Sequence, residues 1–405
     1  MTLPFGLSYG KSQISFEVGA TGDDASRGNM GVRASIQTHL YDTYPVVFDY
    51  FWIGSVLADG AFVQFGYGFQ PGPATYCLEA VVKSGVTNCL GESELVSNTE
   101  GRWEWQYWPS VNGRDFYYEI GQANSVGTNG TWHQYSIISS GSKWEFLLDG
   151  AVVGNLTATV SISRDPPLML AEKTGNDQLV GSLGPVAFRN LGYLKQNVWR
   201  SVESLLVVRS CSPTQTCNLD QPYGVTVVGD TMLVGSVHEK PENGELLWTS
   251  GFATLNVAAH PNAQFSVSTY AGQRLFVGNA TMEVPKGMLV YVSLVDTTVP
   301  SPGILGLLGA KDQFEAWIGE KSGNTSLQIL MENNYTLRAT WRSDYASPVL
   351  LILSALSITL GILVYAKLRK RRALESLSSN HTPSSRFCSD RYFLPRESRN
   401  LALDL

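Results

Sequence analysis

The segment RWEWQYWP, residues 102–109, carries the densest set of side chains that could bind or transform a ligand. Alternate residues of a β-strand point to opposite faces, so the odd-numbered aromatic residues of this segment would share one face and the even-numbered residues the other. The even-numbered row, together with the matching row of the later segment DFYYEIG, gives five candidate ligand-binding residues: Glu104, Gln106, Trp108, Tyr117 and Glu119.

This row has the chemistry of a sugar-binding surface. A sugar is recognised by a flat aromatic ring that covers its apolar face and by carboxylates or amides that bond its hydroxyls. The row supplies both kinds of side chain, although it could equally be the ordinary polar surface of a sheet. Its two carboxylates, Glu104 and Glu119, also suggest a glycosidase, because glycoside hydrolysis uses two carboxyl groups about 5 to 9 Å apart.

Other catalytic and metal-binding patterns are missing from the sequence. Its five histidines, His133 included, are scattered and form no H-E-x-x-H pair, and there is no G-x-S-x-G motif or Gly-rich phosphate loop. We therefore expect no catalytic residue, no metal enzyme and no cofactor. Residues 22–24 (GDD) and 175–177 (GND) offer oxygen ligands for a structural calcium ion, but both are also common turn sequences.

The elements around these residues are predicted to be β-strands. Charged residues make up only 16% of the 405 residues, and glycine and aromatic residues are plentiful, which favours short strands and tight turns over salt-bridged helices. Asp59-Gly60 and Asp149-Gly150 each separate two β-rich runs, and Asp-Gly is a strong hairpin signal because both central residues take positive φ. The chain is therefore predicted to be all-β, with two or three domains.

The stretch GTWHQYSIISSGSKWEFLLDGAVVG, residues 130–154, resembles a strand pattern of concanavalin A-like and laminin-G-like jelly rolls. The resemblance implies a sandwich of two curved antiparallel sheets over residues 1–195, in a family whose concave face often binds carbohydrate. The hydrolases of such families carry dense acidic motifs such as E-x-D-x-x-E, which this sequence lacks, so we expect binding without catalysis. The core of the sandwich would include four aromatic residues, Trp132, Tyr135, Trp144 and Phe146.

A second resemblance lies closer to the C-terminus. The segment FEAWIGEKSGNTSLQILMENNYTLRATW resembles an internalin-type B repeat, a small β-grasp-like module, and implies such a module at residues 276–345 of a prokaryotic surface protein. Residues 196–275 have no recognisable signature and are expected to form a β-rich middle region. The segment TTVPSPGILGLLGAKD is predicted to be a mobile, apolar loop that adheres to other surfaces. The repeat pattern is matched by Phe314, Trp317, Gly319, Ile329, Met331, Asn334, Thr336, Ala339 and Trp341.

Residues 348–366, PVLLILSALSITLGILVYA, contain no charge and are long enough to cross a bilayer as a helix. The basic cluster KLRKRR follows at once, and such clusters stay on the cytoplasmic side of a membrane. We therefore expect one transmembrane helix at residues 346–367, residues 1–345 outside the cell and a basic, disordered cytoplasmic tail at residues 368–405. The rest of the chain is acidic, which argues against nucleic acid as a partner.

The predicted exterior also carries modification signals. Two close pairs of cysteines suggest two disulfides, Cys77 with Cys89 and Cys211 with Cys217. Four cysteines allow three connectivities in all. Five sequons predict glycosylation at Asn129, Asn155, Asn279, Asn324 and Asn334. Residues 1–18 lack the basic and apolar regions of a signal peptide, so we expect a leader encoded upstream of Met1.

These features predict a single-pass protein of the cell membrane that recognises carbohydrate or a neighbouring surface protein and contacts membrane lipid. Two alternatives from other classes stay open. One is a membrane-tethered glycosidase that uses Glu104 and Glu119, and the other is a purely structural envelope protein.

Overall fold

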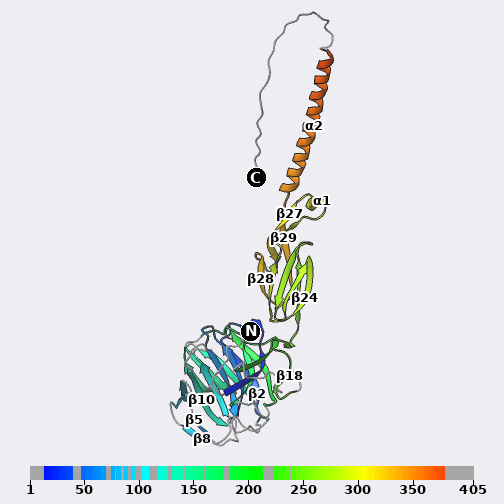
Figure 1. Ribbon diagram of the computed structural model, residues 1–405. Coiled ribbons are helices and arrows are strands. Elements are labelled where there is room, and N and C mark those ends of the chain that lie inside the picture. The colour runs from blue at the N-terminus through cyan, green and yellow to red at the C-terminus, as the bar shows by residue number, and fades with distance from the viewer. Residues whose placement is uncertain are drawn as a thin grey trace, which may run out of the picture. The chain divides into compact units, whose positions relative to one another are not determined.

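The computed structural model describes residues 13–39, 47–69, 74–77, 79–83, 86–89, 93–96, 102–108, 117–125, 130–140, 142–158, 161–176, 183–212, 223–237 and 239–378. The chain divides into two compact units. The first comprises Met1–Val299 and Asp312–Arg342, and the second Pro300–Lys311 and Ser343–Leu405. The described part is mostly β-strand, as predicted, with one long apolar helix near the C-terminus (Figure 1).

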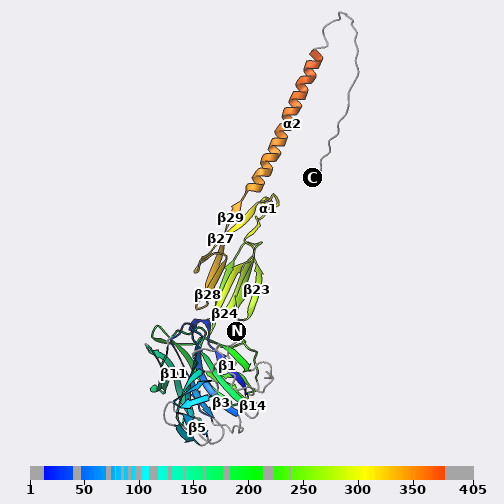
Figure 2. The same cartoon turned by 60° about the vertical axis from the view of Figure 1, so that its left-hand side comes forward.

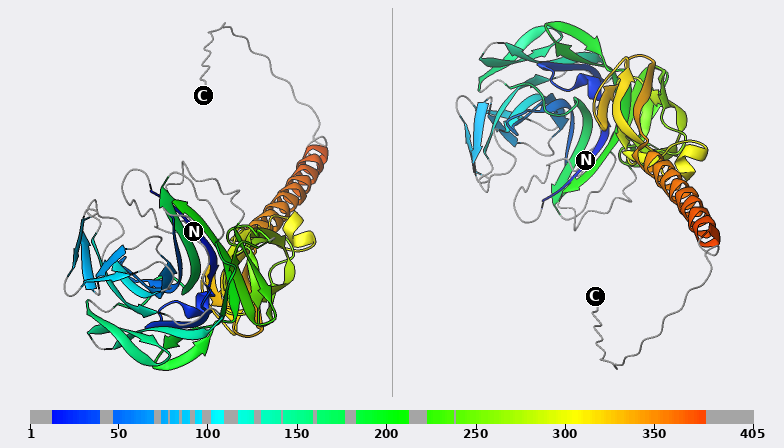
Figure 3. Two further views of the ribbon diagram at one scale, coloured as in Figure 1. Left: turned by 90° about the horizontal axis from the view of Figure 1, so that it is seen from below. Right: turned by 90° about the horizontal axis from the view of Figure 1, so that it is seen from above.

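Most of the first unit is a sandwich of two antiparallel sheets, which Figure 3 shows face to face. Sheet A has the strand order β20-β17-β1-β14-β3-β4-β9-β10-β6-β7 in the described residues. Its strands are β1 (Gln13–Thr21), β3 (Val47–Val56), β4 (Phe62–Phe69), β6 (Glu79–Lys83), β7 (Val86–Cys89), β9 (Arg102–Trp108), β10 (Tyr117–Ser125), β14 (Leu168–Asn176), β17 (Ser204–Ser212) and β20 (Leu246–Thr249).

Sheet B has the order β13-β12-β11-β2-β15-β19-β18, with β16 paired to β15. Its strands are β2 (Gly31–Gln37), β11 (Trp132–Ser140), β12 (Lys143–Leu148), β13 (Ala151–Thr157), β15 (Val186–Lys195), β16 (Val198–Ser201), β18 (Gly224–Val228) and β19 (Thr231–Gly235). A short pair, β5 (Ala74–Cys77) with β8 (Ser93–Val96), and a 3₁₀ turn, η1 (Asp24–Ser26), complete this part.

Alternation along the strands builds the core between the two sheets. In β9 the predicted aromatic row points inward, because Trp103, Trp105 and Tyr107 belong to the buried cluster. The ring of Trp105 stacks on Phe146 of β12 with centroids 4.7 Å apart. The other predicted core residues of sheet B, Tyr135, Trp144 and Phe146, are buried, whereas Trp132 is half-buried beneath the Arg189 guanidinium.

The two predicted Asp-Gly turns join consecutive strands but differ in conformation. Asp149 and Gly150, between β12 and β13, both have positive φ, as the sequence predicts. Between β3 and β4 only Gly60 has positive φ. There the Asp59 carboxylate accepts the Ala61 amide at 3.0 Å, and a longer turn closes between Leu57 and Ala61.

The expected middle region at residues 196–275 is not a body of its own. Strands β17 and β20 extend sheet A, and β18 and β19 extend sheet B, so the sandwich continues to Thr249. The next strand, β21 (Phe252–Ala258), already belongs to the module that follows. The sequence boundary failed because β-rich runs show strand content but not which sheet each run joins.

The module after residue 250 consists of two sheets around a second core. One sheet has the order β24-β21-β29-β27-β26 and includes a parallel pair, β21 with β29; the other has the order β23-β22-β25-β28. The further strands are β22 (Gln264–Thr269), β23 (Gly272–Val277), β24 (Asn279–Pro285), β25 (Leu289–Leu294), β26 (Thr298–Pro300), β27 (Lys311–Gly319), β28 (Ser326–Leu330) and β29 (Tyr335–Asp344).

This two-sheet arrangement differs from the β-grasp shape implied by the repeat resemblance, because residues 251–342 contain no helix longer than α1 (Ile304–Leu307). The motif residues nevertheless build the module. Trp317, Ile329 and Met331 are fully buried, and Asn334 Oδ1 accepts the Thr254 amide at 2.8 Å. The pattern therefore found the core positions of the module but not its topology.

The second unit contains α2 (Ala346–Ser378), visible in Figures 1 and 2 as the orange helix. Its segment Ala346–Glu375 is long and apolar enough to cross a membrane, and none of its most apolar window is buried within the protein. Such a surface of exposed leucine, isoleucine and valine is unfavourable in water and favourable in lipid.

Candidate functional site

The outer face of sheet A, which points away from sheet B, carries the predicted polar row. Strand register assembles this face from successive strands. Paired residues lie on the same face. One register row runs Gly19, Leu170, Trp52, Gly66 and Glu104, and the next runs Thr21, Leu168, Gly54, Gln64 and Gln106.

Hydrogen bonds join the polar residues of these two rows. Gln106 Oε1 accepts from Gln64 Nε2 at 2.8 Å and from Trp108 Nε1 at 3.2 Å. Gln106 Nε2 in turn donates to the Glu104 carboxylate. All four side chains are buried, so the hydrogen bonds offset the cost of removing these polar groups from water.

Aromatic side chains flank this network, which we call the Gln106 network (Gln64, Glu104, Gln106 and Trp108). Trp52, only 3% exposed, lies in the same row as Glu104 and packs edge-on against Phe62 with centroids 5.4 Å apart. Its indole Nε1 is buried and has no hydrogen-bond partner within the described part of the chain. A buried donor without an acceptor is costly in a folded protein, and it marks a position where a ligand oxygen could be bound.

A small cavity lies beside Trp52, where Gly66 has no side chain. Tyr50, Trp52, Gln64, Gly66 and Glu104 line this cavity of about 10 Å³, roughly the space of one water molecule. A Cβ at Gly66 would collide with the backbone of Phe51 and Trp52. Glycine is therefore required at this position for the strands to approach closely.

The structure brings three of the five predicted binding residues together and separates two. Glu104, Gln106 and Trp108 form the network described above. In β10, however, Glu119 pairs with Tyr107, and Glu104 pairs with Gln122. Because faces alternate along a strand, the register places Tyr117 and Glu119 in the opposite row from Glu104, contrary to the sequence prediction. Alternation within DFYYEIG was evident, but the register against β9 was not.

This register also bears on the glycosidase alternative. The positions on either side of Glu104 in its row are Gly66 and Gln122, and neither is acidic. The acidic residue Glu172 of the same face is three strands away, which is about 14 Å at the usual strand spacing. That exceeds the separation of about 5 to 9.5 Å used by glycosidases.

A pair of neighbouring carboxyl groups lies elsewhere on the same face. Glu17 and Glu172 are paired across β1 and β14 and are 3% and 5% exposed. Burial and, after it, the charge of Glu172 raise the pKa of Glu17 to about 8, although the hydrogen bond from Ser210 lowers it. Ser210 Oγ donates to Glu17 Oε2 at 2.7 Å. Glu17 therefore carries a proton at neutral pH.

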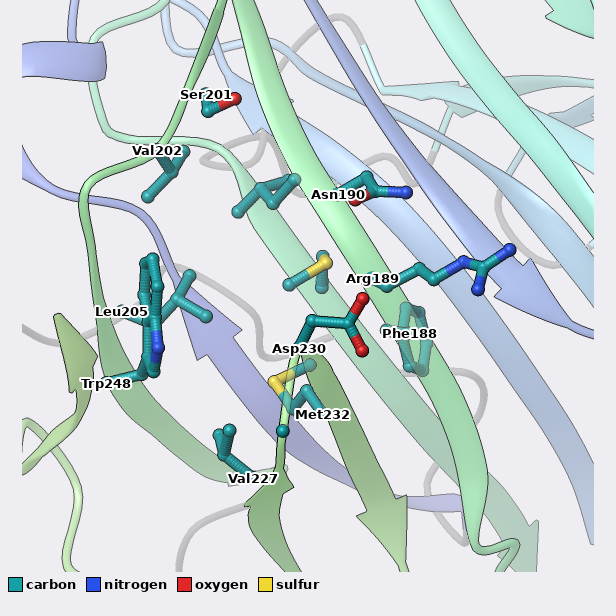
Figure 4. Close-up of a pocket in the computed structure, with 13 residues that line it drawn as sticks. Phe188, Arg189, Asn190, Ser201, Val202, Leu205, Val227, Asp230, Met232 and Trp248 are labelled. Carbon is teal, nitrogen blue, oxygen red and sulfur yellow. The ribbon is translucent and has the colours of Figure 1, made fainter. Parts of the chain in front are cut away.

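A larger pocket of about 200 Å³ lies between the sheets, away from this network (Figure 4). Its walls are mostly apolar and include Met169, Leu205 and Met232. Figure 4 shows the Trp248 ring on one side and the Asp230 carboxylate on the other. The pocket has room for one apolar group of about ten non-hydrogen atoms at close packing. Sequence reasoning did not find this pocket, since its lining comes from seven strands, β14 to β20, and from the turns between them.

The first predicted calcium site does not have free carboxylate oxygens. Asp23 accepts three backbone amides, those of Ser26, Glu203 and Ser204, and burial raises its pKa to about 6 despite these bonds. Asp24 accepts the Leu289 amide. Backbone amides thus surround these two carboxylates, at the place where a calcium ion would need free oxygen atoms. Asp177 of the second predicted site lies outside the described residues, within which no cluster of three or more His, Cys, Asp or Glu could hold a metal.

His133 has a structural partner in place of a catalytic one. Its Nδ1 lies 2.7 Å from Asp149 Oδ2, and Asp149 Oδ1 accepts the Gln134 amide at 2.8 Å. The histidine therefore fixes the Asp149-Gly150 turn to β11.

The predicted modification sites are placed in part. Asn155, Asn279, Asn324 and Asn334 are exposed, whereas Asn129 lies outside the described residues. Cys77 ends β5, Cys89 ends β7 and Cys211 lies in β17, whereas Cys217 lies outside the described residues. The side chains of all four cysteines also lie outside the described part. Glycosylation and the two disulfides stay predictions.

Sequence reasoning missed two residues of the site, Trp52 and Gln64. The signal was present, because alternation in VFDYFWIGSV and FVQFGYGF puts both residues on the face opposite the core residues Phe51 and Phe65. The row contains glycines, which hid its polar character.

Comparison with known proteins identifies no family for this chain. No protein family model matches the chain, and no curated protein is similar to it in sequence. Among solved structures, scytalido-glutamic peptidase with a transition state analog inhibitor covers 55% of this chain and 98% of its own, with 13% identity and a TM-score of 0.31. A kappa-carrageenase from Zobellia galactanivorans covers 40% and 62%, with 11% identity and a TM-score of 0.25. A family 16 glycoside hydrolase from Bacteroides ovatus covers 41% and 69%, with 10% identity and a TM-score of 0.23. At these scores the likeness indicates neither substrate nor activity.

Proposed function

We propose that this chain is a membrane-anchored binding protein that recognises carbohydrate on the outer face of sheet A, without catalysis. One observation carries the proposal: the unpartnered indole N–H of Trp52 lies in the same face as the Gln106 network. An aromatic ring beside amides and a carboxylate is the combination that sugar hydroxyls and ring faces require.

The absence of catalysis in this proposal rests on geometry. Glu104 has no acidic neighbour in its register row, and its carboxylate accepts a hydrogen bond from Gln106. A glycosidase needs a second carboxyl group within about 5 to 9.5 Å, and the row supplies none beside Glu104. Glu17 is protonated and adjacent to Glu172, so it is the residue whose substitution tests the glycosidase alternative.

Anchoring is the second part of the proposal. The apolar helix α2 is followed directly by a basic cluster, and this order favours residues 1–345 outside the cell and the C-terminus in the cytoplasm. Protease added to intact cells should therefore remove most of the chain and leave a membrane-protected fragment that contains α2. Full protection of the chain would contradict this orientation.

The binding test uses the full chain in lipid nanodiscs on a glycan array. Trp52→Leu should abolish binding, and Trp52→Phe, which keeps a ring but loses the N–H, should weaken it about 5- to 10-fold, the usual effect of one hydrogen bond. Trp248→Leu is the matched control, because it removes an indole from the pocket of Figure 4 and should leave binding unchanged.

The same preparation separates the alternatives. Polysaccharide hydrolysis that disappears in Glu17→Gln or Glu104→Gln would replace the binding proposal with a glycosidase. Loss of glycan binding in Trp248→Leu but not in Trp52→Leu would move the site to the pocket. Silence of the wild-type chain in both assays would favour the structural envelope protein.

A further inference from the structure

The second compact unit exposes aliphatic side chains beside the start of α2. Residues 300–311 belong to this unit together with the helix, and Figures 1 and 2 both show α1 next to the N-terminal end of α2. Ile304 and Leu307 are 71% and 88% exposed. Leu305 and Leu308 add a further exposed apolar surface. A contiguous patch of this kind marks a surface that contacts another apolar phase.

The loop is an ordered turn whose ends and C-terminal half are hydrogen-bonded within it. The Ser301 amide donates to the Ala310 carbonyl at 3.0 Å and closes the loop. Within it the amides of Leu308 and Ala310 donate to Ile304 and Leu305 at 3.1 and 2.9 Å. Internal pairing removes much of the cost of placing a backbone in lipid, because amides left unpaired there have no water to bond.

The position and composition of the loop both point to the bilayer. A Cβ on Gly309 would lie 3.2 Å from Ser347 Cβ, so the loop touches the first turn of α2. No charged residue occurs between Pro300 and Ala310. Tyr345, one residue before the helix, is 47% exposed, and tyrosine is favoured at the membrane–water boundary.

We propose that residues 303–308 insert into the lipid leaflet at the N-terminal end of α2, as a second, reversible membrane contact beside the helix. The inference rests on the proposed anchoring by α2. A tip of four aliphatic residues beside a single helix gives a second point of attachment to the bilayer. The partner is the acyl region of the bilayer next to its headgroups.

The test places an environment-sensitive fluorescent amino acid by amber suppression at position 307 of the full chain in nanodiscs. Parallel samples carry the probe at position 360, within α2, and at position 275 on β23, where Leu275 is 58% exposed. Nanodiscs are built from ordinary phosphatidylcholine or from phosphatidylcholine brominated near the headgroup end of its acyl chains. We expect bromine to quench the probe at 307 at least threefold more than the probe at 275.

The controls separate the loop from the anchor. Quenching at 360 without quenching at 307 would overturn the loop proposal and leave anchoring intact, whereas no quenching at either position would refute anchoring itself. Blue-shifted emission at 307 without bromine quenching would mean that the loop packs on protein, either a second copy or a partner, and would also overturn the proposal. Adding Ile304→Asp should reduce quenching at 307 several-fold, while Val277→Asp, an equally exposed aliphatic position on β23, should not.

Discussion

Both faces of sheet A bury side chains in the described residues, but these side chains are stabilised in different ways. The inner face packs against sheet B through Phe51, Phe65 and Trp105, and burial of these apolar side chains is itself favourable. The outer face buries the Gln106 network and the Glu17–Glu172 pair, whose burial is offset by hydrogen bonds and by a retained proton. One sheet thus packs an apolar core on one side and buries hydrogen-bonded polar groups on the other.

The largest effect is expected from breaking a charged pair on the mostly apolar inner face. Lys173 Nζ lies 2.9 Å from Asp49 Oδ1, and both side chains are fully buried. Burial raises the pKa of Asp49, and the charge of Lys173 partly opposes this rise. Lys173→Met would leave a buried carboxylate without its cation, so we expect a loss of about 3–5 kcal/mol in the free energy of unfolding. Chemical denaturation of the full chain in nanodiscs measures it.

Two variants sharpen this result. Asp49→Leu combined with Lys173→Met should cost less than Lys173→Met alone, because no charge is then left buried. Arg27→Met, at the partly exposed pair with Asp24, should cost about 1 kcal/mol or less. A double variant as unstable as the single one would show that packing, and not charge, dominates at this position.

The second prediction concerns the outer face and pH. Because the folded-state pKa of Glu17 is raised from 4.5 to about 8, the folded protein holds a proton that the unfolded chain releases between these values. Stability therefore falls as pH rises from about 4.5 to 8 and levels off above 8. Glu17→Gln should remove this fall, with a gain on the order of a few kcal/mol at pH 8.5 and almost none at pH 4.5.

Thermal unfolding between pH 4.5 and 9 measures the difference. Glu283→Gln, an exposed carboxylate on β24, is the matched control and should leave the pH profile unchanged. An equal shift at every pH in Glu17→Gln would contradict a retained proton, and would indicate altered packing alone.

The third prediction tests whether the Gln106 network acts as a unit. Gln106→Leu removes the acceptor of Gln64 and Trp108 and a donor to Glu104, so we expect a loss of about 1–3 kcal/mol. Gln64→Leu alone should cost about 1 kcal/mol. A double-mutant cycle should give a coupling of about 0.5–1.5 kcal/mol between the two positions, and strict additivity would show that they act independently.

The contrast between the faces also explains what the sequence could and could not predict. Alternation within RWEWQYWP is a local property, so the buried aromatic row and the residues Glu104, Gln106 and Trp108 followed from it. Register between strands far apart in the chain depends on tertiary packing, and therefore Glu119 was assigned to the wrong row. The sheet membership of residues 196–249 failed for the same reason, since any β-rich run can join either sheet.

The smallest expected effect tests the claim that the inner face depends on packing rather than on polar bonds. Tyr67 is buried on this face, and its hydroxyl donates to the Gln37 carbonyl at 3.1 Å and accepts the His39 amide at 2.9 Å. Tyr67→Phe keeps the ring, which lies 5.2 Å from that of Phe51, and should cost about 1 kcal/mol. Tyr67→Ala removes the ring as well and should cost about 3–5 kcal/mol.

Chemical denaturation of the two variants measures both losses in the free energy of unfolding, and so their ratio. A Tyr67→Phe loss close to that of Tyr67→Ala would mean that the hydroxyl, and not the ring, stabilises this edge of the core, and the distinction between the two faces of sheet A would fail at this residue.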